Sequence, residues 1–208
     1  MNTASLAFYR THNRMLQLGN RLQGRHYTAS ELTKNIRRQF DTMHYIVRTN
    51  RDYAVDPDSV VVSGLYDSHN DRAKLPAMEL TLSYHPEQAL FYVDQINWPQ
   101  LAFDIAECTG HELVHKMQSR KRNRPGQEYA SASLDPKRQA DQEYLGTDDE
   151  IEAYGFSIAA ESHMLNRAFT ECAMYLVYQE TFDNDAGVIL KLQQQVEVYK
   201  KQLESVNE

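Results

Sequence analysis

The segment His111-Glu-Leu-Val-His115 is the feature that most restricts the possible folds of the chain. The four-residue spacing of its two histidines suits an α-helix. On an α-helix, residues four apart lie one turn apart on the same face, so both imidazoles can reach one ion. Glu112 lies about 100° around that helix from His111, where it can face a water molecule held by the ion without being a ligand. The core-facing side is supplied by Ala106, Gly110, Leu113, Val114 and Met117. The pattern predicts a helix from Pro99 to about Ser119 that carries a metal site.

A catalytic zinc site needs a third protein ligand. A zinc ion held by three protein groups keeps its fourth position for water and lowers the pKa of that water to about 7. Glu112 would then take the proton as general base. Downstream, the candidates for the third ligand are Glu150, Glu152, Glu161 and His163.

Two motifs together resemble the gluzincin-type zinc metallopeptidases, which include small prokaryotic and phage members. One is His111–His115, and the other is Glu150-Ile-Glu-Ala153-Tyr-Gly-Phe156, which resembles the glutamate-helix signature of that group. The resemblance implies a zincin-like fold, hydrolysis of peptide bonds, and Zn²⁺ bound by His111, His115 and Glu150. It covers about 50 residues, from the first helix to the second.

The second motif departs from the family pattern at two positions. Tyr154 stands where some gluzincins place an aspartate that orients a zinc-bound histidine, so Asp104, Asp148, Asp149 or a backbone carbonyl would have to replace it. Asp149 also replaces the thermolysin-like asparagine before the ligand. The subfamily and the substrate therefore stay open.

Glu150 also fits a structural role. In a capping box over Thr147–Glu150, its carboxylate would return to the amide at the start of its own helix, and Glu152 would become the ligand. A donor to the developing oxyanion is also needed, and Tyr144, Tyr154 and His163 are the candidates. The substrate backbone could add to an edge strand at Met78–Tyr84 or Ala89–Val93, and the alternative that both are inner strands stays open.

Hydrophobic periodicity predicts the surrounding elements. Residues 1–50 form two helical pieces, the second starting at a capping box at Thr28 and continuing its apolar stripe to Val47. Strands are expected over Ser59–Gly64, Met78–Tyr84 and Ala89–Val93, and the last two are expected to form a hairpin. The polar stretch Asp67–Lys74 is expected to be an exposed connection. A polar loop over 120–146 precedes a long helix from Thr147 to about Glu180. A helix over 186–206 has a heptad-like seam that we expect to pack on the body.

The predicted fold class is α+β, with a small, mostly antiparallel sheet against the metal-site helix and the glutamate helix. A chain of 208 residues with 41% hydrophobic residues predicts one domain over 1–208. The net charge of −7 argues against nucleic-acid binding, so Arg120–Arg124 is interpreted as a solvated complement to a helix C-terminus. No apolar run approaches membrane-spanning length, which excludes a membrane partner. Cys108 and Cys172 fit buried helix positions, which predicts a reducing compartment: the cytoplasm, or the host cytoplasm or virion if phage-encoded.

The leading hypothesis is a zinc metallopeptidase acting on a protein or peptide. The alternative is a zincin-fold scaffold or interaction protein within a larger assembly, with homo- or hetero-oligomers formed through the C-terminal helices. A zinc hydrolase acting on another amide would use the same residues. Glu112 favours an enzyme, because a purely structural zinc site needs no base beside it.

Overall fold

The computed structural model describes residues 3–57, 59–94, 98–122, 128–183 and 185–205. It is α+β, with small, mostly antiparallel sheets, as predicted. The chain divides into two compact units, Ala7–Glu112 and Met1–Leu6 with Leu113–Glu208. One continuous helix, α4 (Trp98–Lys121), begins in the first unit and ends in the second. The expectation of a single domain stays a prediction.

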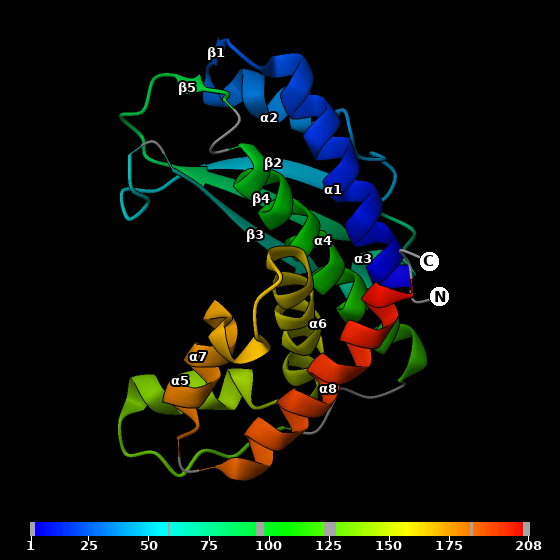
Figure 1. Ribbon diagram of the computed structural model, residues 1–208, viewed down its shortest axis with the longest axis vertical. Coiled ribbons are helices and arrows are strands. Elements are labelled where there is room, and N and C mark those ends of the chain that lie inside the picture. The colour runs from blue at the N-terminus through cyan, green and yellow to red at the C-terminus, as the bar shows by residue number, and fades with distance from the viewer. Residues whose placement is uncertain (1–2, 58, 95–97, 123–127, 184, 206–208) are drawn as a thin grey trace. The chain divides into compact units, whose positions relative to one another are not determined.

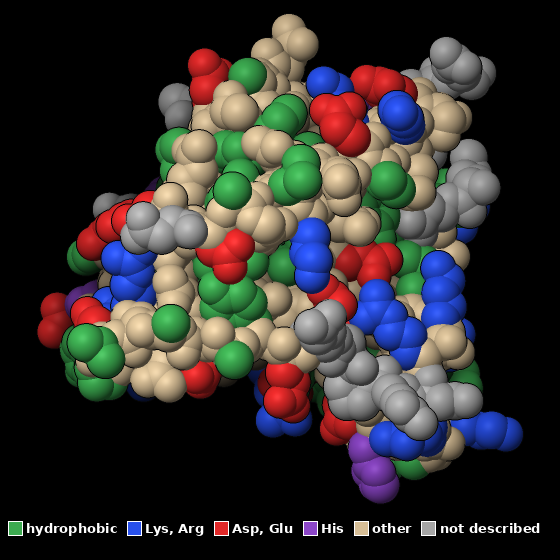
Figure 2. Space-filling view, turned by 90° about the horizontal axis from the view of Figure 1, so that it is seen from below, with side chains coloured by type: hydrophobic (Ala, Val, Ile, Leu, Met, Phe, Trp, Pro, Cys, Tyr) green, Lys and Arg blue, Asp and Glu red, His purple; other side chains and the backbone are tan. Residues whose placement is uncertain are grey.

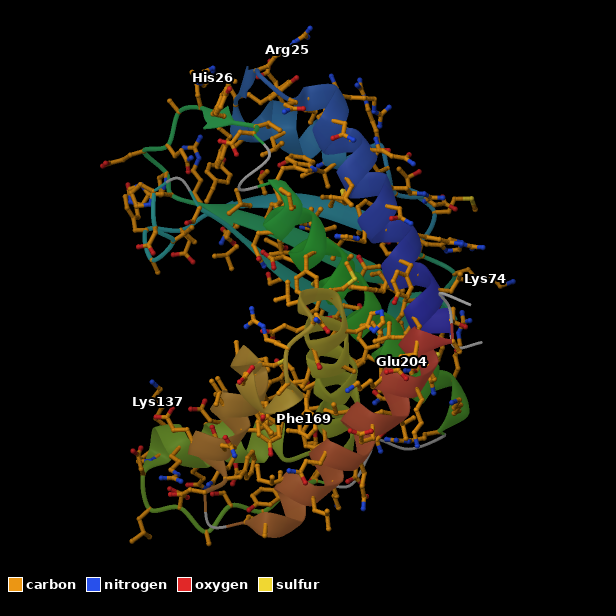
Figure 3. All side chains as sticks on the ribbon, in the orientation of Figure 1. Arg25, His26, Lys74, Lys137, Phe169 and Glu204 are labelled. Atoms are coloured by element: carbon orange, nitrogen blue, oxygen red, sulfur yellow. The ribbon has the colours of Figure 1, made fainter. Side chains whose placement is uncertain are left out.

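The first unit contains two sheets (Figure 1). In the larger sheet β4 (Met78–Tyr84) is the central strand, parallel to β2 (Tyr45–Arg51) and antiparallel to β3 (Val60–Tyr66). The smaller sheet pairs β1 (His26–Tyr27) with β5 (Phe91–Tyr92). The predicted hairpin between 78–84 and 89–93 is therefore wrong, because β4 has a neighbour on each side and β5 pairs elsewhere. His26, labelled in Figure 3, has its ring centre 5.0 Å from that of Tyr92.

Strand β2 was not expected from the sequence. Helix α2 (Ala29–Arg37) starts at Thr28 with the predicted capping box, but it ends before the apolar stripe does. Val47 lies on β2 instead, and its carbonyl accepts from Arg37 Nη2 at 2.7 Å. The helix-like spacing of apolar side chains continued by coincidence into a strand, in which Val47 is the one buried residue.

Helix α4 packs on the larger sheet beside α1 (Thr3–Leu22), as Figure 1 shows. Trp98 at the start of α4 donates its indole N–H to the carbonyl of Met15 at 2.7 Å. A hydrophobic core joins α1, α2, the sheets and α4, and its α4 members are Trp98, Leu101, Ala102, Ile105 and Cys108. The polar connection expected after Asp67 contains a short helix, α3 (Ser68–Arg72), capped by Asp67. The metal-site helix is thus fixed along its first half by a buried apolar face.

The second unit is helical. After the end of α4 come α5 (Pro136–Leu145), α6 (Asp148–Leu165), the 3₁₀ turn η1 (Phe169–Glu171), α7 (Ala173–Thr181) and α8 (Ala186–Glu204). The predicted helix from Thr147 to Glu180 is two helices, because Asn166 takes a left-handed conformation that ends α6. Phe169, labelled in Figure 3, packs edge-on to Tyr175 with ring centres 5.3 Å apart.

The predicted seam of α8 is buried within its own unit, where α8 packs on α6. Its buried members are Val188, Leu192, Val196, Tyr199 and Leu203. Arg124 and Val206, which the predicted segments included, lie outside the described residues. None of the described helices combines the length and apolar character needed to cross a bilayer.

Candidate metal centre

The centre begins with α4, which carries both predicted histidines. His111 is 8% exposed and Glu112 is 7% exposed, so this turn of the helix is nearly closed to solvent. His115 follows one turn later on the same helix. The two imidazoles therefore share a face, as their spacing predicts.

Glu150 completes a cluster of three groups that could hold a metal ion. One ligand atom each from His111, His115 and Glu150 lies within 4.8 Å of the other two. His115 Nε2 is 3.5 Å from Glu150 Oε1. Two imidazole nitrogens and one carboxylate oxygen are a ligand set that zinc accepts. The resemblance implied these three residues, and the structure brings them together.

The carboxylate of Glu150 does not serve its own helix start. Thr147 caps α6 by accepting from the backbone N–H of Glu150 at 3.3 Å, while the Glu150 side chain faces His115 and Tyr144. Burial raises the pKa of Glu150, and His115 and a hydrogen bond from Tyr144 act in the opposite direction. A cation beside this buried carboxylate would favour its charged form.

Glu152, the alternative ligand, takes part in a different set of contacts. Its Oε2 accepts from Arg122 Nη2 at 3.0 Å and from Gln118 Nε2 at 3.1 Å, and its Oε1 accepts from the Tyr199 hydroxyl at 3.3 Å. Arg122 also forms an ion pair with Asp149. Glu152 thus joins α4, α6 and α8 and is not a member of the cluster.

Gln118 holds the imidazole of His115. The amide is 4% exposed, its Oε1 is 2.9 Å from His115 Nδ1, and its Nε2 donates to the Asp149 carbonyl at 2.9 Å. Because that carbonyl only accepts, the amide nitrogen must face it, and the amide oxygen must face His115. His115 Nδ1 then carries the proton, and the unprotonated Nε2, 3.5 Å from Glu150 Oε1, is the nitrogen that could bind a metal.

The carboxylates expected to orient a histidine have other partners. Asp149 pairs with Arg122, Asp148 Oδ1 is 3.1 Å from Lys191 Nζ, and Asp104 accepts from Gln100 at 2.7 Å. The neutral amide of Gln118, three residues after His115, orients the His115 imidazole instead. Gln118 was not among the residues expected to orient a histidine, although its three-residue spacing from His115 places both on one helix face.

Strand β3 passes directly over Glu112. A Cβ built on Gly64 would lie 2.7 Å from Glu112 Cγ and 2.6 Å from Cys108 Sγ, so only glycine fits there without a shift. β3 is also an edge strand of the larger sheet. Met78–Tyr84 is the inner strand β4, which was one of the two expectations for it, and β5, within Ala89–Val93, lies at the edge of the separate two-stranded sheet. A glycine within a β-branched run was the missed signal.

Tyrosines lie beside the cluster. The Tyr144 side chain is hydrogen-bonded to Glu150 and to Tyr154, and burial, reinforced by the nearby Glu150 charge, raises its pKa far above the ordinary value. Tyr154 packs edge-on to Tyr178, with ring centres 5.8 Å apart. The structure thus places Tyr144 at Glu150, with Tyr154 as its neighbour.

The remaining candidates lie elsewhere on α6. His163 follows Glu150 by 13 residues, which is about 20 Å along the helix. Glu161 accepts from Arg167 Nη1 at 3.3 Å and from the backbone N–H of Ala173 at 3.2 Å. The structure does not bring either residue into the cluster.

The basic segment at the end of α4 has part of its positive charge paired with carboxylates. Arg122 binds two carboxylates of α6 rather than standing only in solvent, contrary to the sequence interpretation. Figure 2 shows basic and acidic side chains side by side on the face that it draws.

No protein-family model, no curated protein and no solved structure matches the chain. The metal cluster and its surroundings therefore carry the functional argument by themselves.

Proposed function

We propose that the chain is a zinc-dependent metallopeptidase. The observation that carries this proposal is the cluster of His111, His115 and Glu150, with the buried carboxylate of Glu112 adjacent on the same helix. A structural metal site has no need of a base next to its ligands. Glu112 therefore favours a hydrolase over a scaffold.

The residues present fit a zinc ion. Nitrogen and oxygen donors are of the type that zinc prefers, and three protein ligands are the number found at catalytic zinc sites. When bound, zinc would lower the pKa of a water molecule and polarise the carbonyl of the peptide bond. The bond from His115 Nδ1 to Gln118 sets the tautomer that such binding requires.

Glu112 supplies the proton transfers. It accepts a proton from the water molecule as the water oxygen bonds to the carbonyl carbon, and it then donates that proton to the amine nitrogen as the C–N bond breaks. The hydroxyl of Tyr144, beside Glu150, is the donor best placed to stabilise the negative charge that develops on the carbonyl oxygen. The edge of β3 would bind the substrate backbone next to Glu112 by strand addition.

The test is Glu112→Gln, compared with wild type on unfolded protein substrates, with new amino termini as the readout. We expect the variant to keep its zinc and to lose activity by about 10²- to 10⁴-fold, the usual contribution of a general base. Exhaustive chelation should abolish wild-type activity, and zinc should restore it. Hydrolysis that persists without metal, or in Glu112→Gln, would contradict the proposal. A zinc-loaded wild type that cleaves none of the substrates would favour the scaffold.

A further inference from the structure

A cavity of about 350 Å³ lies in the first unit, next to the N-terminal end of β3. Its walls are mostly apolar and come from α4, β3 and the segment around β5. The wall residues that matter for the argument are Val60, Val61, Phe91, Trp98, Leu101 and Asp104. Asp104 is the one carboxylate among the described residues that line this cavity.

The cavity and Glu112 lie along the same two elements. On α4, Asp104 precedes His111 by seven residues, which is two turns on one face and about 10 Å along the helix. On β3, Val60 precedes Gly64 by four residues, or about 13 Å of extended chain. Since Gly64 lies over Glu112, β3 leads from the cavity to the general base. A peptide extended along β3 would therefore meet both, about four residues apart.

The chemistry of the cavity selects one kind of side chain. Its apolar walls suit a long aliphatic chain, and the partly buried carboxylate of Asp104 suits a positive charge at the end of that chain. Burial raises the pKa of Asp104, because the charged form loses water there, and Gln100 restores only part of that loss. A cationic partner would offset this cost.

We propose that this cavity binds a lysine or arginine side chain of the peptide substrate, with Asp104 as the specificity-determining residue. The aliphatic part of the side chain packs against Trp98 and Leu101, and its cation pairs with the Asp104 carboxylate. The cleavage preference that follows, a basic residue about four residues from the broken bond, rests on the proposed peptidase function. Binding of the side chain does not.

Trp98 makes the binding measurable without catalysis. It is the single tryptophan of the chain, and it lines the cavity. The probes are acetylated, amidated tetra-alanine peptides in which one residue is lysine, arginine, norleucine or glutamate, titrated against the fluorescence of Trp98. The proteins are wild type, Asp104→Asn and the matched control Glu87→Gln, which removes one exposed carboxylate elsewhere in the same unit. Circular dichroism checks the fold of each variant, and Glu112→Gln removes hydrolysis from the measurement.

We expect saturable binding of the lysine and arginine peptides. The norleucine and glutamate peptides should bind with at least tenfold lower affinity. Asp104→Asn should weaken binding of the basic peptides at least tenfold, and Glu87→Gln should not change it. Equal binding of lysine and norleucine peptides, or no response to any peptide at millimolar concentration, would overturn the inference. A folded protein that binds the basic peptides but takes no zinc would overturn only the proposed function, and one that cleaves peptides without a Trp98 response would overturn only this inference.

Discussion

At the scale of single residues, the orientation of the His115 imidazole is set by Gln118. Gln118 accepts from His115 Nδ1 and donates to the Asp149 carbonyl and to Glu152, so the amide has a defined orientation. Residues that orient a metal ligand commonly change metal affinity by 10- to 100-fold when they are removed. Gln118 is therefore a positioning residue that ties α4 to the start of α6.

Gln118→Met should reduce zinc affinity by about 10- to 100-fold, because His115 loses the acceptor that fixes its tautomer. Gln118→Glu should restore most of the affinity, since a carboxylate oxygen can accept the same N–H. Competition with a chromogenic chelator measures the affinity, and thermal unfolding of the metal-free proteins checks the fold. Equal zinc affinity in wild type and Gln118→Met would exclude the positioning role.

The sequence identified the cluster but not what surrounds it. The four-residue spacing of His111 and His115 determines their shared face on any helix, so that part follows from local geometry. Glu150 required a resemblance, because its approach to His115 depends on how α6 meets α4. The choice against Glu152 could not be made from the sequence, since it depends on Arg122 and Tyr199, which are 30 and 47 residues away.

At the scale of elements, β3 is the strand that passes over Glu112. Local patterns predicted its existence, but its place at the edge of the sheet depends on pairing with β4, which is a long-range property. The sequence also missed β2, where a helical spacing of apolar residues continued into a strand. Short strands of this kind are decided by their neighbours in the sheet more than by their own residues.

Gly64→Ala should lower the rate of peptide hydrolysis by about tenfold or more while leaving one zinc bound per chain. The added Cβ would meet the Glu112 and Cys108 side chains and displace Glu112, the proposed general base. Ser63→Ala, on the exposed face of the same strand, is the matched control and should retain wild-type activity. Steady-state kinetics measure the hydrolysis rate, and metal analysis measures the zinc content. Full activity in Gly64→Ala would contradict the prediction, because it would show that Glu112 tolerates the added Cβ.

Helix α8 provides a test of pH dependence. Asp185 caps it, and the hydrogen bond from the Tyr129 hydroxyl at 2.8 Å is the main cause that lowers the Asp185 pKa below its ordinary value of 3.8. A carboxyl with a lowered pKa contributes stability that is present above the ordinary value and is lost as pH falls through the lower, folded value. The contribution should therefore be complete at neutral pH and absent in strong acid.

Asp185→Asn should lower the free energy of unfolding at pH 7 by about 0.5 kcal/mol, the usual size of an exposed charge at a helix terminus. The difference from wild type should vanish in urea titrations carried out well below pH 3.8. Asp141→Asn, an exposed carboxylate on α5, serves as control and should change neither titration. A deficit that is the same at both pH values would show that the charge of Asp185 is irrelevant.

At the scale of the whole molecule, α4 runs from one compact unit into the other. The first unit contains the larger sheet, the cavity and His111, and the second contains His115 and Glu150. The heptad-like seam of α8 is covered by packing within the second unit, which follows the sequence expectation that it packs on the body. Oligomers formed through the C-terminal helices remain a prediction, which light scattering can test.

Removal of the metal should loosen the second unit in particular. A ligand present at about a hundred times its Kd stabilises the folded state by about 2.7 kcal/mol, so chelation should lower the unfolding temperature measurably. Hydrogen exchange should increase in 113–121 and 148–165, the segments that His115 and Glu150 join. Glu150→Gln should show no further change on chelation. Equal stability with and without zinc would contradict binding to the folded chain.

The most direct test of the account is the zinc content of purified wild type, Glu150→Gln and Glu152→Gln by elemental analysis after dialysis. The two variants remove one charge each, two residues apart on the same helix, and only Glu150 belongs to the cluster. We predict one zinc per chain in wild type and in Glu152→Gln, and a large loss in Glu150→Gln. Full zinc content in Glu150→Gln, or a folded wild type that takes up none after reconstitution, would contradict the metal centre.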